Sequence, residues 1–145
     1  MGLHRQIYEE VLILVPNIRE LENRKESYLL RCKNQVPVNV CIDLQANERT
    51  CIVLCALPYD GQGNIVPAPY VEFELYHDRG QAIPIMYVDS HFKLERKTCS
   101  VLDEEHLNQK VYSWLVRLQR LGFKLEGETK EAVLGRNAQP ASLAP

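Results

Sequence analysis

The spacing of the apolar residues changes along this chain, and that change constrains the fold more than any other feature. Near the start, apolar side chains recur three or four positions apart, as on one side of an amphipathic helix. These residues are Leu3, Ile7, Val11, Leu14 and Ile18. Pro16 cannot continue a helix without the loss of a backbone hydrogen bond, so we expect the helix to end or break there. From Ser27 onward the period is two, which indicates strands.

Three strands are predicted next. Residues 28–33 and 38–45 alternate apolar with polar side chains, as in strands with one buried face. Residues 49–57 are more uniformly apolar, which is typical of a strand covered on both faces. Residues 58–69 are rich in turn formers and form the longest predicted loop. Binding residues gather on such loops, but a plain surface loop is the interpretation that we favour.

The clearest hairpin joins residues 71–78 to residues 81–88. Gly80 can adopt the left-handed backbone conformation that a tight connection requires. Pro84 has no backbone N–H, so the second strand is expected to lie at a sheet edge or to be broken at that residue. A further short strand is expected within residues 91–99.

The last predicted element is a helix that faces the core. Its apolar residues lie on one helix face; they are Leu107, Val111, Trp114, Leu115, Leu118 and Leu121. Asp103 suits its N-cap and Gly122 its C-cap. Residues 126–145 lose the periodicity and are expected to form a flexible tail. The sequence therefore predicts a single α+β domain over residues 1–125, in which an N-terminal and a C-terminal helix pack on an antiparallel sheet of about five strands.

Composition limits the classes of function. A chain of 145 residues, of which 46% are hydrophobic and 25% charged, is able to bury one core. Its net charge of −2 gives no general attraction to nucleic acid or to anionic lipid. The apolar run at residues 11–15 is too short for a signal-peptide core or a membrane span, so we expect a cytoplasmic protein with no membrane partner.

The five cysteines are expected to be reduced thiols, because their number is odd and no export signal is present. They are Cys32, Cys41, Cys51, Cys55 and Cys99. Cys51 and Cys55 share a face of the predicted strand but lie about 13 Å apart, which is too far for a disulfide or a shared metal ion. We expect the cysteines to be buried apolar residues.

His77 is the first candidate site residue, because His-Asp at the end of a strand is a suitable setting for general acid–base chemistry. On a regular strand, His77 continues the core face that begins at Val71, whereas Tyr76 and Asp78 point to the other face. This alternation separates His77 from Asp78. It favours a structural histidine that ends the strand over a catalytic one.

Acidic residues on the same strand are a second candidate. Glu72, Glu74 and Asp78 line one face at intervals of about 7 Å, which would suit paired carboxylates, but a solvated sheet face is the interpretation that we favour. The four histidines have no Cys or His partner at metal-ligand spacing, and no nucleophile elbow or phosphate-binding loop is present. The sequence predicts no catalytic residues, no metal site and no cofactor.

A basic stripe follows the last helix. Lys110, Arg117, Arg120 and Lys124 have no acid among them. Such a stripe could bind phosphate or an acidic partner. A solvated helix side, whose long side chains cover the edge of the core, is the interpretation that we favour.

Two segments resemble a known family. They are residues 67–78 (PAPYVEFELYHD), followed by Ala82, and residues 103–115 (DEEHLNQKVYSWL), continued to Gly122. Together they resemble the YqiB-like family of proteobacterial proteins, which carry a domain of unknown function. Val15-Pro16 also resembles the Leu-Pro step that ends the first helix of that family. The resemblance departs between Met86 and Leu102, where the family has a longer aromatic stretch with a Tyr-Pro step.

The resemblance implies a small α+β domain without an assigned activity. Genes of that family often neighbour those for ADP-ribose pyrophosphatase and cyclic AMP phosphodiesterase, which implies a link to nucleotide signalling. It also draws attention to Tyr76, His77 and Asp78.

The sequence favours a non-enzymatic protein-binding or regulatory module with a protein partner, because it contains no catalytic constellation. The first alternative is a binder or hydrolase of a small nucleotide-like molecule at Tyr76, His77 and Asp78. The second is nucleic-acid binding through Arg117 and Arg120 on the last helix. These five residues are the candidate binding residues.

Overall fold

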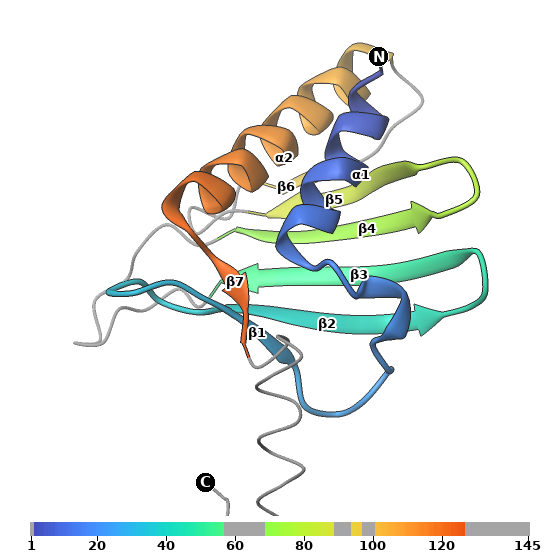
Figure 1. The fold of residues 1–145 in the computed structure, drawn as a ribbon. Helices are drawn as coiled ribbons and strands as arrows, with labels where there is room; N and C mark the ends of the chain where they lie inside the picture. The colour runs from blue at the N-terminus through green and yellow to red at the C-terminus, as the bar shows by residue number, and fades with distance from the viewer. Residues whose placement is uncertain (1, 57–68, 89–93, 97–100, 127–145) are drawn as a thin grey trace, which may run out of the picture.

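The computed structural model describes residues 2–56, 69–88, 94–96 and 101–126. It shows one antiparallel sheet with both long helices on the same face (Figure 1). The predicted α+β class, with a helix from each end of the sheet-forming region packed on the sheet, is confirmed. The predicted loop, apart from Pro69, and the predicted tail, apart from Glu126, lie outside the described residues.

Within the described residues, the sheet contains seven strands in the order β6-β5-β4-β3-β2-β1-β7, and every neighbouring pair is antiparallel. The bounds of the elements are α1 Leu3–Leu14, a 3-10 turn η1 Ile18–Glu20, β1 Tyr28–Arg31, β2 Val38–Gln45, β3 Arg49–Ala56, β4 Tyr70–Tyr76, β5 Gln81–Val88, β6 Leu94–Arg96, α2 Val101–Leu121 and β7 Lys124–Leu125. Strands β1 to β5 correspond to the expected five. The short β6 lies in the segment where a further strand was expected, whereas β7 was not predicted.

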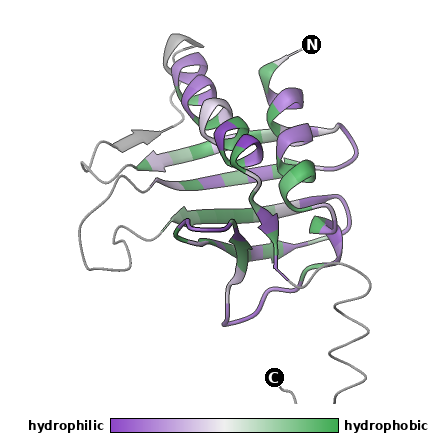
Figure 2. Cartoon of the chain, turned by 60° about the vertical axis from the view of Figure 1, so that its left-hand side comes forward, coloured by the Kyte–Doolittle hydropathy of each residue, from purple (hydrophilic) through white to green (hydrophobic). Residues whose placement is uncertain are grey.

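The core lies between the two helices and one face of the sheet. Its helix side contains the predicted apolar positions except Leu121, which is 45% exposed at the end of α2, so that part of the prediction is wrong. Figure 2 shows β3 as a largely hydrophobic strand beneath the helices. Burial of one such aliphatic side chain contributes about 1.5–3 kcal/mol to stability. The largest fully buried side chains are Ile7, Leu14, Ile18, Leu30, Ile52, Leu54, Phe73, Leu75, Leu107 and Leu115.

Helix α1 ends at Leu14, two residues before Pro16, as predicted. Helix α2 begins at Val101, so the prediction that Asp103 is its N-cap is wrong. An acidic residue is favourable both at the cap and in the first turn, where it interacts with the helix dipole, and the sequence does not distinguish the two positions.

The C-terminal end of α2 has the predicted glycine. Gly122 has a φ of 94°, its N–H donates to the carbonyl of Gln119, and the N–H of Phe123 donates to the carbonyl of Leu118, each at 3.1 Å. This pair of hydrogen bonds is a Schellman motif, which satisfies two otherwise unpaired carbonyls. The turn directs the chain from α2 into β7, which pairs with β1.

The predicted hairpin is formed by β4 and β5. Gly80 has a φ of 62° in the connection, as expected. Pro84 lies opposite Phe73, beside a shift in the β4–β5 register. Strand β6 pairs only with residues 86–88 of β5, so Pro84 lies on a part of β5 that β6 does not cover. The proline therefore lies beside an irregularity of the ladder and at an edge of the described sheet, which are the two settings that the sequence predicted for it.

The cysteines differ from the prediction. The four described ones, Cys32, Cys41, Cys51 and Cys55, are half-buried thiols rather than fully buried core residues. The last three follow the face of the sheet opposite the helices, where β3 is only partly covered. The apolar run at residues 49–57 had predicted a strand covered on both faces. That prediction was too strong, because the apolar residues Cys51 and Cys55 lie on the face that is only partly covered. Among the described helices, none is long and apolar enough to cross a membrane.

Candidate functional site

His77 follows β4 directly and lies on the helix-facing side of the sheet, with 9% of its surface exposed. Its N–H donates to the carbonyl of Glu48, so the pairing with the β2–β3 hairpin extends one residue beyond β4. Both ring nitrogens have partners. Nδ1 lies 3.0 Å from the hydroxyl of Tyr8 on α1, and Nε2 lies 2.8 Å from Oγ1 of Thr50 on β3. The predicted position of His77 on the core face is confirmed.

The hydrogen bonds continue from Thr50 across the sheet. The Thr50 hydroxyl donates to Oε1 of Gln45 on β2. The Gln45 Nε2 donates in turn to the carbonyls of Ile18 and Leu21, each at 2.8 Å. We call Tyr8, His77, Thr50 and Gln45 the His77 network. It joins α1, three strands and the 3-10 turn.

The direction of these bonds defines the protonation of His77. Because Gln45 donates to two carbonyls, its oxygen must accept from Thr50, and the Thr50 hydroxyl must then accept from Nε2–H of His77. Nδ1 is left to accept from Tyr8. Burial, together with the positive charge of Arg19, lowers the pKa of His77 and so favours this neutral tautomer.

Tyr76 and Asp78 do not join His77. The Tyr76 hydroxyl donates to Oε1 of Glu74 at 3.1 Å on the opposite side of the sheet, and the guanidinium of Arg79 lies 4.2 Å from the centre of its ring. Asp78 is exposed in the hairpin connection. The structure therefore does not bring the three candidate residues into one site: Tyr76 and His77 lie on opposite faces of the sheet, and Asp78 lies in the hairpin connection.

The two carboxylates on the face of β4 opposite the helices, Glu72 and Glu74, have partners close by. The Tyr70 hydroxyl donates to Oε2 of Glu72 at 3.0 Å, and burial together with this carboxylate raises the pKa of Tyr70 to about 12. Glu74 accepts from Tyr76 and forms an ion pair with Arg49 at 3.6 Å. Each carboxylate thus has its own partner on a partly solvated sheet, which is consistent with the favoured interpretation of this face.

The four basic residues of the predicted stripe, Lys110, Arg117, Arg120 and Lys124, do not form one continuous surface. Lys110 and Arg117 lie beside Tyr87 of β5 and line the same groove. Arg120 is exposed and is not among the described lining residues of that groove; its charge lowers the pKa of Glu10 on α1, although burial has the larger, opposite effect. Lys124 belongs to β7 rather than to the helix.

The groove beside α2 was not predicted from the sequence. It has a volume of about 410 Å³. We call it the α2–β5 groove; its lining residues are Tyr87, His106, Gln109, Lys110, Ser113, Trp114 and Arg117. Nζ of Lys110 lies 5.7 Å from the centre of the Tyr87 ring, within reach of a cation–π contact. The sequence pattern assigned Trp114 to the core face, but its half-buried ring lies at the margin of that face.

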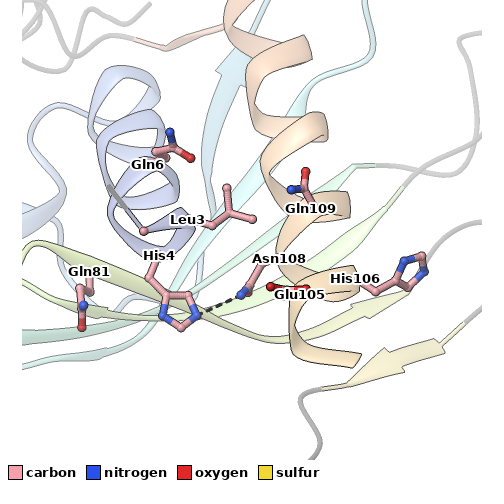
Figure 3. Close-up of a pocket in the computed structure, with 9 residues that line it drawn as sticks. Leu3, His4, Gln6, Gln81, Glu105, His106, Asn108 and Gln109 are labelled. Atoms are coloured by element: carbon pink, nitrogen blue, oxygen red, sulfur yellow. Dashed lines mark hydrogen bonds between the residues drawn. The ribbon is translucent and has the colours of Figure 1, made fainter. Parts of the chain in front are cut away.

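A second pocket lies on the other side of α2, against α1. It has a volume of about 740 Å³. We call it the α1–α2 pocket; its lining residues are Gly2, Leu3, His4, Gln6, Gln81, Glu105, His106, Asn108 and Gln109. Figure 3 shows His4 and Asn108 pointing toward each other, whereas His106 points away from them. Nδ2 of Asn108 lies 3.2 Å from Nε2 of His4. These two residues are 104 positions apart, so no local pattern could have indicated the pair.

The fold and these sites define a small α+β domain with an antiparallel sheet and two polar pockets beside its second helix. Within the described ranges, no group of three or more His, Cys, Asp or Glu side chains is placed to hold a metal ion. Comparison with family models, with curated proteins and with solved structures gave no match.

Proposed function

We propose that this chain is a non-enzymatic binding module, and that an acidic segment of a protein partner docks in the α2–β5 groove. The observation that carries the proposal is the pairing of two aromatic rings, Tyr87 and Trp114, with two cations, Lys110 and Arg117, in one groove. No acid is among the described residues that line it.

Aromatic residues and arginine are the side chains most enriched at the energetic centres of protein interfaces. The rings offer an apolar contact for a side chain of the partner, and the cations attract carboxylates and orient the segment. We therefore expect the partner to present an acidic stretch with an apolar anchor. The YqiB-like family and the cytoplasmic location remain predictions that accompany this proposal.

Two features favour this function over the alternatives. Hydrolysis at His77 would need a ring nitrogen that can take or give a proton, but both nitrogens are held inside the His77 network. Nucleic-acid binding along the last helix would need a continuous row of cations, but among the described lining residues only Lys110 and Arg117 are cations of this groove.

The test uses Trp114 as a probe, since it is the only tryptophan in the chain and lines the groove. We expect its fluorescence to change in a saturable way when a synthetic peptide of glutamates around one leucine is added. Charge reversal by Arg117→Glu should weaken this binding by about tenfold, which corresponds to ~1.4 kcal/mol. Lys33→Glu, an exposed charge reversal in the turn after β1, is the matched control and should bind like the wild type.

Three results would overturn the proposal. One is no saturable change with the acidic peptide, and another is equal binding of the same peptide with lysines in place of glutamates. The third is tighter binding of ATP or of a thymidine oligonucleotide than of the peptide, with the same dependence on Arg117. That result would assign the groove to nucleotides instead.

A further inference from the structure

We propose that the α1–α2 pocket binds a small, uncharged molecule rich in hydroxyl groups, such as a monosaccharide or a polyol, and that the Asn108–His4 pair orients it. This proposal concerns a different site from the groove and does not depend on the function proposed above. It rests on three observations: one half-used buried amide, the chemistry of the pocket lining, and the charge of that lining.

Asn108 is the central residue of the pocket. Only 8% of its surface is exposed, yet its single hydrogen bond within the described part of the chain joins Nδ2 to Nε2 of His4. The carbonyl oxygen of the same amide bonds to no described residue. The amide has two donor hydrogens and one acceptor oxygen, and this oxygen is not among the buried polar atoms that lack a partner, so it is open to the pocket. A ligand hydroxyl can therefore donate to this oxygen in place of water.

The lining is suited to hydroxyl groups. Four of its side chains are carboxamides and two are imidazoles; they are Gln6, Gln81, Asn108, Gln109, His4 and His106. A hydroxyl both donates and accepts, so it pairs with either end of a carboxamide. The pocket volume of about 740 Å³ is within the range of small-molecule sites. Figure 3 shows these polar groups supplied by α1, α2 and the start of β5.

The charge of the lining excludes an anionic ligand. No Lys or Arg is among the described residues that line this pocket, and the one charged side chain is the carboxylate of Glu105. Phosphate and carboxylate groups are usually held by Arg or Lys. The pocket therefore differs in chemistry from the α2–β5 groove, although His106 and Gln109 line both.

The experiment is an NMR titration of the side-chain amides of the ¹⁵N-labelled protein. The probes are glucose, galactose, ribose and inositol, with glucose 6-phosphate as the anionic counterpart of glucose. We expect at least one neutral probe to shift the amide signals of Asn108 and Gln81 in a saturable way. Glucose 6-phosphate should bind more weakly than glucose if glucose is bound.

Variants separate recognition from stability. Gln81→Ala removes one carboxamide from the pocket, and we expect it to weaken binding of the neutral probe by about tenfold. Gln119→Ala removes an exposed carboxamide from the same helix outside the pocket and should change nothing. Asn108→Leu should abolish binding; Gln81→Ala keeps the test valid if that variant does not fold.

The proposal is wrong if no neutral probe shifts the Asn108 signals at concentrations up to the solubility of the sugars. It is also wrong if the phosphorylated sugar binds more tightly than the neutral one, or if Gln81→Ala and Gln119→Ala have equal effects. The two proposals can fail independently. The groove is tested with an acidic peptide and the pocket with neutral sugars, so a negative result for one site does not decide the other.

Discussion

The His77 network and the α1–α2 pocket are built from the same kinds of groups but use them in opposite ways. Each places a histidine beside a buried carboxamide or hydroxyl at a contact between α1 and another element. In the network, both ring nitrogens of His77 and the amide of Gln45 are bonded within the protein. In the pocket, Asn108 has an unused acceptor. Pairing within the fold, rather than residue type, therefore decides which polar groups are available to a ligand.

The largest effect is expected from breaking the network. His77→Leu would leave the half-buried Tyr8 hydroxyl without its acceptor and would remove one of the two hydrogen bonds of the Thr50 hydroxyl, which still donates to Gln45. One unsatisfied group costs about 1–3 kcal/mol and one lost hydrogen bond about 1 kcal/mol, so we expect a loss of roughly 2–4 kcal/mol. Urea unfolding of the variant and the wild type measures the difference. A loss within 0.5 kcal/mol of zero would show that the network contributes little to stability.

A smaller effect is expected from the pocket. Asn108→Leu removes one hydrogen bond to His4 but also removes an amide that the fold only half uses. We expect a loss of about 1 kcal/mol or less in the same urea experiment, which is the usual net value of one hydrogen bond. If Asn108→Leu lowered the free energy of unfolding as much as His77→Leu, the amide of Asn108 would be as important to the fold as the His77 network, and the comparison would be wrong.

Acidification should affect the network with a defined sign. Because the pKa of His77 in the folded state lies below its value of about 6.5 in the unfolded chain, the unfolded state takes up the proton first. The stabilisation from neutral His77 is therefore complete above about pH 6.5. It is lost as the pH falls from there through the folded-state pKa.

The comparison of wild type with His77→Gln isolates this effect. Burial raises the pKa of Glu10, which acts with the opposite sign, but both proteins retain Glu10. The wild type should lose more stability than the variant between pH 7.5 and pH 5.5 when unfolding is followed at both values. Parallel losses would show that His77 does not titrate differently in the two states.

The smallest effect is expected at Asp78. Asp78→Ala changes an exposed residue of the hairpin connection, and such changes usually stay within ±0.5 kcal/mol. A thermal unfolding curve that overlays the wild type would confirm that the His-Asp sequence has no structural partnership. A large drop in the melting temperature would instead reveal a role for Asp78 that its exposure does not explain.

Patterns with a short period were sufficient to predict most of the fold. The alternation along β4 placed His77 on the core face, and Gly80 and Gly122 marked the turns where they occur. The strand β7 was not predictable, because two residues after a helix carry no period and pair only through contact with β1. The half-buried cysteines were also missed, since a pattern of apolar residues does not show which sheet face the helices leave uncovered.

The candidate sites were less predictable than the fold. Tyr76 and His77 are adjacent in the sequence, yet they lie on opposite faces of the sheet, and Asp78 is exposed in the hairpin connection. His4 and Asn108 meet only because α1 and α2 pack together, and Tyr87 reaches Lys110 only because β5 passes beside α2. Sites of this kind depend on tertiary packing, which a single sequence does not display.

The pairing of β1 with β7 has a consequence for synthesis on the ribosome. Leu30 of β1 pairs with Leu125 of β7, so one edge of β1 has no partner until nearly the whole described chain has been made. At 5–20 residues per second, this interval lasts roughly 5–20 s. During that time β1 exposes an open backbone edge, and β7, the last strand of the described residues, closes that edge when it has been translated.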